Sequence, residues 1–207
     1  MKTINIALFA LGILCFVGTA SAQTGTVKLS ANYSYALPLS DLKDFVDSRN
    51  SAAGWQADIM YGVTDKLSLG AGFGYQSFSK KYPREVYHVG GSDISSVLTN
   101  SVEIMPLQVK ARYNFIPTGN IQPYVAAGIG AQLVLYRQML GEYDWDSRNK
   151  AGFAATPAAG VIVPLSKRNG IAFNVEAAYN YLPFNYGVVN NLNNLAIRGG
   201  LTFDLRK

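Results

Sequence analysis

Sulfur chemistry is almost absent from this chain, which has one cysteine, Cys15, in 207 residues. Because Cys15 lies within the first 22 residues, which we expect to be removed, the mature chain would hold no thiol. It would then form no disulfide and use no cysteine nucleophile. The residue before Cys15 is Leu14, where lipoprotein processing requires a small side chain, so acylation of Cys15 is not expected.

Histidine is equally scarce, since His88 is the single one. A lone imidazole argues against a histidine-rich metal site, and no thiolate is present to replace the missing ligands. We therefore expect neither a metal centre nor a cofactor.

Long apolar runs are missing after residue 22, so the mature chain holds no candidate for a membrane-spanning helix of about 20 residues. Charge of one sign is also not concentrated anywhere. The 18 basic and 13 acidic residues leave a net charge of +5 that is scattered along the chain, which argues against a nucleic-acid partner.

The amino terminus carries the pattern of a secretory signal. Lys2 gives a positive start, residues 6–17 form a short apolar core, and Ala20-Ser21-Ala22 offers a cleavage site before Gln23. We expect residues 1–22 to be a cleaved signal peptide. The remaining 185 residues, 23–207, suit one domain.

What the mature chain has in abundance is alternation. Between Val27 and Leu205, about eight runs place apolar or aromatic residues on every second position, with polar or very small residues between them. The run from Leu67 to Gln76 is the clearest, because its second face holds three glycines. The sequence predicts an all-β protein, an eight-stranded antiparallel up-and-down transmembrane β-barrel that crosses the membrane with its strands.

Two observations orient the faces of this barrel. Aromatic residues of the apolar face gather at the ends of the runs, and the connections alternate between short and long. Both are typical of an outer-membrane barrel with lipid outside, short periplasmic turns and long extracellular loops. A soluble secreted lipocalin-like carrier, with its apolar face inward, remains the alternative. The aromatic residues are Tyr33, Tyr35, Trp55, Tyr75, Tyr179 and Tyr181 at one rim and Tyr61, Tyr113, Phe115 and Phe203 at the other.

Two prolines fall within predicted strands, Pro106 and Pro157. A closed barrel has no free edge that tolerates a missing N–H group, so each is expected to mark a β-bulge or the end of a strand.

The last run, Arg198 to Leu205, has a polar residue, a glycine two positions later and two spaced hydrophobic residues. With the preceding alternation, the whole mature chain resembles the small outer-membrane β-barrel proteins of the OmpA/OmpX type. The resemblance implies the cell outer membrane of a Gram-negative bacterium, with lipid and lipopolysaccharide as surroundings. It also implies that Arg198, Gly200, Phe203 and Leu205 are an assembly signal for the barrel-assembly machinery. The chain departs from the commonest form by ending in Arg206-Lys207 instead of an aromatic residue.

The polar faces of the runs carry charges that the alternation directs into the lumen. An eight-stranded barrel is only wide enough for side chains to fill it, so these charges must pair. We expect a structural charge network; a gated, porin-like path for ions or small solutes is the alternative. The residues are Asp58, Lys110, Arg112, Glu176 and Arg198.

Two of the predicted long loops are candidates for binding. Residues 79–100 are basic and aromatic, and residues 138–150 are acidic and aromatic. Loops on a rigid scaffold commonly carry binding, so an extracellular ligand or protein partner is one interpretation. The other is that the two oppositely charged loops fold over one another and close the outer mouth. The candidate contact residues are Tyr82, Arg84, Tyr87, His88, Tyr143 and Trp145.

Catalysis has a weaker basis. Some barrels of this kind modify lipid A with serine, histidine and an acidic residue, and His88, Ser92 and Asp93 lie within one stretch. Nothing in the sequence fixes their geometry. We therefore expect a non-enzymatic outer-membrane barrel with a structural or surface-interaction role through its extracellular loops.

Overall fold

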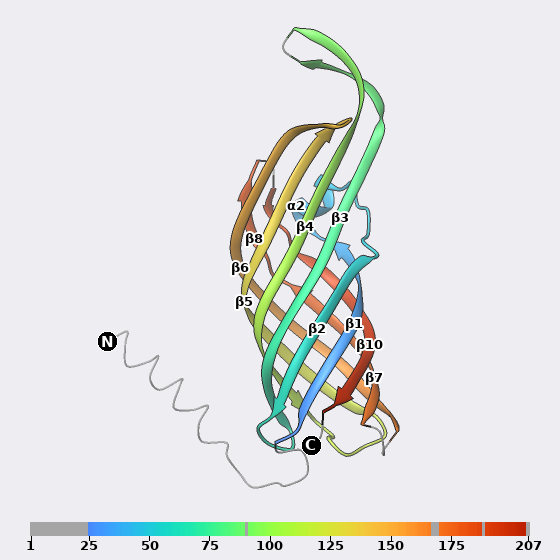
Figure 1. Ribbon diagram of the computed structural model, residues 1–207, viewed down its shortest axis with the longest axis vertical. Coiled ribbons are helices and arrows are strands. Elements are labelled where there is room, and N and C mark those ends of the chain that lie inside the picture. Colours follow the sequence, from blue (N-terminus) through green and yellow to red (C-terminus); the bar gives the residue numbers. More distant parts are fainter. Residues whose placement is uncertain (1–24, 90, 167–169, 188, 206–207) are drawn as a thin grey trace, which may run out of the picture.

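The computed structural model describes residues 25–89, 91–166, 170–187 and 189–205. Eight of the described strands form one closed barrel in the order β1-β10-β7-β6-β5-β4-β3-β2, and β8 and β9 form a separate two-stranded sheet (Figure 1). The expected signal peptide, residues 1–22, lies outside the described residues. The elements are β1 (Val27–Pro38), α2 (Ser40–Phe45), β2 (Ala53–Gly62), β3 (Leu67–Val89), β4 (Ser92–Asn114), β5 (Gln122–Leu140), β6 (Tyr143–Ser166), β7 (Ile171–Asn180), β8 (Pro183–Tyr186), β9 (Val189–Asn191) and β10 (Asn194–Asp204).

Every barrel strand is antiparallel to its neighbours, and the barrel closes where β1 pairs with β10, from Lys28 opposite Asp204 to Pro38 opposite Asn194. The predicted faces are confirmed. Tyr33, Ile59 and Val109 of the apolar face are exposed on the outside, whereas their polar neighbours Asn32, Asp58 and Lys110 are buried inside. Within the described residues, no helix is long and apolar enough to cross a bilayer.

The prediction for the two prolines was wrong. Pro157 lies within β6 and pairs with Ala127 of β5, although the ladder of β6 with β7 ends beside it, at Ala158 opposite Ala178. Pro106 marks neither a bulge nor a strand end. It pairs with Gln132 of β5, and on its other side the β3–β4 ladder omits two positions without a change of register. An interrupted ladder is how β4 accommodates the missing N–H group.

The expectation of long loops at residues 79–100 and 138–150 was wrong. β3 pairs with β4 as far as Val89 opposite Ser92, and β5 pairs with β6 as far as Leu140 opposite Tyr143. These segments are therefore extensions of the barrel hairpins. They rise well beyond the other strands at the end of the barrel opposite the start of β1 and the end of β10 (Figure 1).

The lumen has two parts of different chemistry. Its periplasmic half is mostly polar, as expected, with a small apolar cluster of Tyr124, Ile162 and Ala172. The half toward the long hairpins is lined by apolar strand residues, among them Phe78, Ile104 and Tyr136. Two segments from the remaining connections fill this apolar half. We call them the plug: residues 40–46, which include α2, and residues 182–187 and 189–192, which include β8 and β9. They contribute Leu42, Phe45, Val46, Leu182, Phe184, Val189 and Leu192 to the buried cluster.

The plug also corrects the prediction that the two charged segments close the outer mouth. The first and the last of the long connections close it instead. The Asn190 backbone N–H donates to Asp41 Oδ2 at 2.8 Å, and the Leu39 N–H donates to the Asn193 carbonyl at 2.9 Å. These two connections close the mouth because their apolar side chains are buried beneath the bonds, and leaving those side chains in water is unfavourable.

Candidate functional site

Two of the predicted lumen charges form a buried ion pair. Lys110 Nζ of β4 lies 2.6 Å from Asp58 Oδ1 of β2, and their side chains are 6% and 1% exposed. Gln56 Nε2 donates a further hydrogen bond to Asp58 Oδ1 at 3.0 Å. Gly72 of β3 lies between the two strands and leaves space for the pair, because a Cβ atom there would collide with Asp58 and Lys110.

A second ion pair joins neighbouring strands. Arg198 of β10 is directly opposite Glu176 of β7, and its Nη1 donates to Glu176 Oε1 at 2.9 Å. Arg198 Nη2 donates to Asn180 Oδ1 at 3.0 Å. Both side chains are almost fully buried, so each charge is compensated where water is excluded.

The fifth lumen charge, Arg112, is held by an aromatic ring. Its guanidinium lies 4.6 Å from the centre of the Tyr124 ring, and the Tyr124 hydroxyl is 3.0 Å from Glu176 Oε2. Tyr124 thus links the second ion pair to the unmatched cation. The sequence placed Tyr124 on the inward face, but nothing in the local pattern marked it as part of the network.

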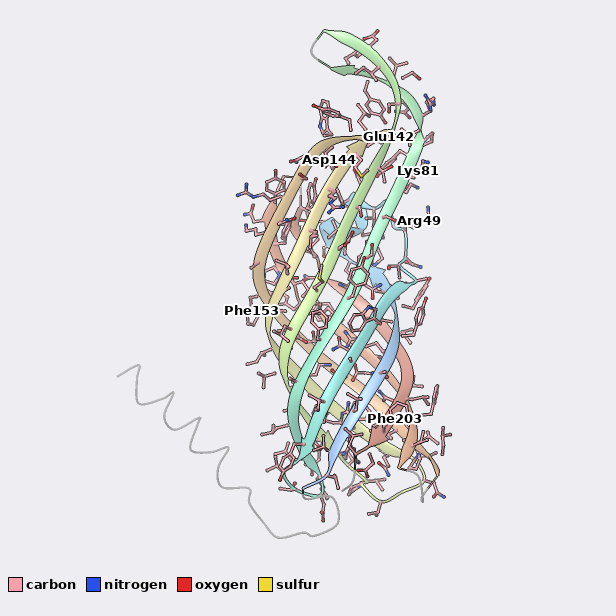
Figure 2. All side chains as sticks on the ribbon, viewed as in Figure 1. Arg49, Lys81, Glu142, Asp144, Phe153 and Phe203 are labelled. Carbon is pink, nitrogen blue, oxygen red and sulfur yellow. The ribbon has the colours of Figure 1, made fainter. Side chains whose placement is uncertain are left out.

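The residues of the proposed assembly signal occupy the closing strand. Arg198 points into the lumen and Leu205 is exposed. Gly200 has a local reason to be glycine, since a Cβ atom there would collide with the Ala31 carbonyl oxygen of β1. Phe203 is half-buried near the periplasmic end of the barrel (Figure 2). Recognition of these residues by the assembly machinery stays a prediction.

The candidate contact residues lie on two separate hairpins. Tyr82, Arg84, Tyr87 and His88 belong to the upper part of β3. Tyr82 is held by the plug, because its hydroxyl donates to the Phe45 carbonyl at 3.4 Å. Tyr143 and Trp145 are exposed at the beginning of β6, on the other hairpin.

His88 and Asp93 form a pair across the tip of the β3–β4 hairpin, where Nδ1 contacts Oδ1. The two side chains are 80% and 66% exposed. Water reaches both side chains at this exposure, so the geometry of the pair gives no support to catalysis. Among the described residues, no group of histidine and carboxylate side chains could hold a metal ion.

A hydrogen bond outside the membrane ties the plug to the barrel wall. The Tyr186 hydroxyl of β8 donates to Asp146 Oδ1 of β6 at 2.6 Å. This bond, together with partial desolvation and the nearby carboxylate charge, raises the pKa of the Tyr186 phenol above its ordinary value. The guanidinium of Arg148 lies 5.8 Å from the same ring.

The chain is similar to known outer-membrane proteins. A family model described as the outer membrane protein beta-barrel domain matches residues 7–203. Among solved structures, Neisserial surface protein A is similar with a TM-score of 0.62 and 14% identity, over 86% of this chain and 97% of that chain. The outer membrane protein OprG from Pseudomonas aeruginosa has a TM-score of 0.59 and 11% identity, over 89% and 98%.

A third similar structure is Ail, the attachment invasion locus protein of Yersinia pestis, in complex with the heparin analogue sucrose octasulfate. Its TM-score is 0.51 at 11% identity, over 88% of this chain and 99% of that chain. At such identities the likeness to these structures shows the fold alone. No protein with a curated function matches the chain.

Proposed function

We propose that this chain is a non-enzymatic surface-interaction protein. The proposal starts from its family, because the chain belongs to the outer membrane protein β-barrel domain family and therefore resides in the cell outer membrane. Its binding element would be the protruding hairpin, which we define as residues 80–89 and 91–99 of β3 and β4. Its partner would be a surface that carries acidic groups, such as a sulfated glycan.

The observation that carries this proposal is the reach of the protruding hairpin. β2 pairs with β3 only as far as Ser77, and β5 pairs with β4 only as far as Leu98. Above these points no described strand pairs with the hairpin on either side, and most of its side chains meet solvent (Figure 1). A rigid two-stranded element held away from the membrane is well placed to contact another surface.

The free edge of β3 is not suited to adding a partner's strand. It carries Lys80, Lys81 and Pro83, and the register shifts between Lys81 and Arg84. Lysine, proline and a bulge are features that protect an edge strand from pairing with another chain. Recognition through side chains therefore fits the hairpin better than β-strand addition.

The charge of these side chains favours an acidic partner. Lys81 and Arg84 are exposed, and the salt bridges found among the described residues involve neither of them. Lys80 contacts Asp47 at 2.6 Å. Arg49 lies below Lys81 on the same side of the molecule, whereas Glu142 and Asp144 lie at the β5–β6 turn (Figure 2). The complex of Ail with a heparin analogue gives a precedent on this fold for such a ligand.

Heparin chromatography of the folded barrel in a neutral detergent tests the proposal. We expect the double variant Lys81→Gln, Arg84→Gln to elute at clearly lower salt than the wild type, because each lost cation removes about one salt-dependent contact. The matched control is Lys66→Gln, an exposed lysine in the turn before β3 at the opposite end of the barrel. Equal elution of the double variant and the wild type would show that the hairpin is not the binding element.

The channel and the lipid A-modifying enzyme receive less support. A channel needs a water-filled path, but both halves of the lumen are occupied by side chains. A lipid A-modifying enzyme needs an organised nucleophile and base, and the His88–Asp93 pair is exposed at the hairpin tip.

A further inference from the structure

On one side of β6, the backbone pairing of the barrel wall changes from a regular ladder to a single bridge. Below Pro157, β6 pairs regularly with β7, and above it the described backbone pairing on that side is a single bridge, Ala155 opposite Tyr181. β6 itself continues upward to Tyr143 along β5. Its upper edge therefore lies beside β8, which pairs with β9 instead. We call this boundary between upper β6 and β8 the seam.

Side-chain hydrogen bonds join the seam in place of a ladder. Lys150 Nζ donates to the Asn185 carbonyl at 2.9 Å, and Gln132 Nε2 of β5 donates to the Pro183 carbonyl at 3.1 Å. Bonds of this kind leave gaps that a continuous ladder would close.

A pocket of about 280 Å³ opens in the seam. This volume is close to the lower end of the range for small-molecule sites, roughly 300 Å³. Phe184, at its inner side, is 5% exposed and belongs to the apolar cluster of the outer lumen. The lining includes Lys150, Ala151, Gly152, Pro183, Phe184 and Asn185.

The outer side of the pocket, at Ala151, lies where lipid headgroups are expected, whereas Lys150 and Gly152 are on the inner face of β6. Phe153 is two residues below Ala151 on the same outward face of β6, and it projects from the barrel wall (Figure 2). Tyr181 is exposed just before β8 and belongs to the outer aromatic rim. Aromatic rings of this kind mark the interface between hydrocarbon and headgroups.

Lys150 gives the pocket its charge. Its ammonium group lies 5.8 Å from the centre of the Phe184 ring, and the salt bridges identified in the described ranges do not include it. Lys150 therefore places a cation at the inner side of a mostly apolar pocket, beside Phe184, and this arrangement suits a molecule with an anionic head and an apolar tail.

We propose that the seam binds a long-chain fatty acid. Its carboxylate would accept a hydrogen bond from Lys150 Nζ, and the first part of its chain would contact Ala151, Pro183 and Phe184. The rest of the chain would continue into the lipid along Phe153 and Tyr181. This site is separate from the protruding hairpin, so neither proposal depends on the other.

Photo-crosslinking tests the site. The full-length folded barrel in phosphatidylcholine nanodiscs is irradiated with a fatty acid that carries a diazirine near its carboxyl end, and the adducts are mapped by mass spectrometry. We expect adducts within residues 150–152 and 183–185. In Lys150→Gln they should fall about five-fold, as expected for the loss of one partly exposed ion pair. Ala151→Phe, which fills the pocket from its exposed side, should reduce them as well.

The matched control is Arg137→Gln, which removes an exposed cation from the neighbouring strand β5 and should leave the adducts unchanged. Heat-modifiable gel migration verifies that each variant is folded. The site is disproved by adducts spread evenly around the lipid-facing strands, or by equal labelling of Lys150→Gln and wild type. Preferential labelling by a phospholipid carrying the same diazirine would also overturn the assignment to a fatty acid.

Discussion

Small residues make room for the buried charges of this protein. The Asp58–Lys110 ion pair occupies the space that a side chain at Gly72 would fill. In a lumen this narrow, a charged pair on two strands therefore depends on the absence of a side chain on the strand between them. Glycine at this position is required by its neighbours and not by its own backbone conformation.

We predict that Gly72→Ala destabilises the folded barrel by about 1–3 kcal/mol, the usual effect of inserting a group into a filled interior. The measurement is the midpoint of urea unfolding in lipid vesicles, followed by tryptophan fluorescence. Gly199→Ala is the control, because a Cβ atom there meets nothing within 4 Å. Equal midpoints for the two variants would contradict the role given to Gly72.

Alternation was sufficient to predict which charges face the lumen, because a period of two assigns every residue of a strand to one face. It was not sufficient to predict their partners. Lys110 meets Asp58 across the intervening strand β3, whereas Arg198 meets Glu176 on an adjacent strand. Which charged residues form an ion pair depends on strand stagger and on side-chain length, and the local pattern does not contain this information. Tyr124 was missed as a member of the network for the same reason.

The strand extensions show why alternation of apolar and polar residues does not predict strands outside the barrel. Inside the barrel, one face meets lipid and the other meets the lumen, so the two faces differ in composition. In the protruding hairpin most side chains of both faces meet water, and polar residues such as Lys81, Arg84 and Ser95 occupy either face. The alternation disappears although the strand continues. A segment of this kind looks like a loop in the sequence.

The contact between β8 and β6 leads to a prediction about pH. We expect Tyr186 to ionise above the ordinary tyrosine value of about 10, because its proton is shared with Asp146. The difference in tyrosinate absorbance between wild type and Tyr186→Phe during an alkaline titration measures this pKa. Asp146→Asn should lower it toward the ordinary value. An unchanged pKa in Asp146→Asn would mean that the bond is not formed in solution.

The raised pKa of Tyr186 also determines how stability depends on pH. A phenol whose pKa is raised in the folded state stabilises that state fully below the unfolded pKa of about 10. The contribution is lost as pH rises through the folded value. Attachment of the plug at Tyr186 is therefore expected to be unaffected near neutral pH and to weaken only in alkali.

The molecule as a whole is a filled cylinder. Ion pairs and amides occupy its periplasmic half, and apolar side chains from the barrel strands and the plug occupy its outer half. An ion that crossed it would have to displace both layers, and apolar side chains do not replace the ion's water.

We predict that the folded protein gives no steady conductance steps in planar bilayers. The double variant Asp58→Asn, Lys110→Gln should also remain at the baseline, because the apolar half is unchanged. A general porin, reconstituted in the same lipid, is the positive control. Reproducible steps from the wild type, absent from mock preparations, would favour the channel alternative.

The fold class and the outer-membrane location could be predicted because they depend on a pattern repeated along the whole chain. Closure of the mouth could not. Leu42, Phe45 and Val46 lie in a connection with one turn of helix, and three apolar residues in a short connection do not indicate what they pack against. Their partners are near the other end of the sequence, in residues 182–187 and 189–192.

That separation sets an order of events during biogenesis. Asp41 and Asn190 are 149 residues apart, and contacts between such distant segments form late because a long loop must first be closed. We expect the two parts of the plug to come together only after β10 has reached β1. Until then the apolar outer lumen has nothing to cover it. A newly inserted barrel would thus pass through a stage in which its strands already cross the membrane while its mouth is still open to proteases and chaperones.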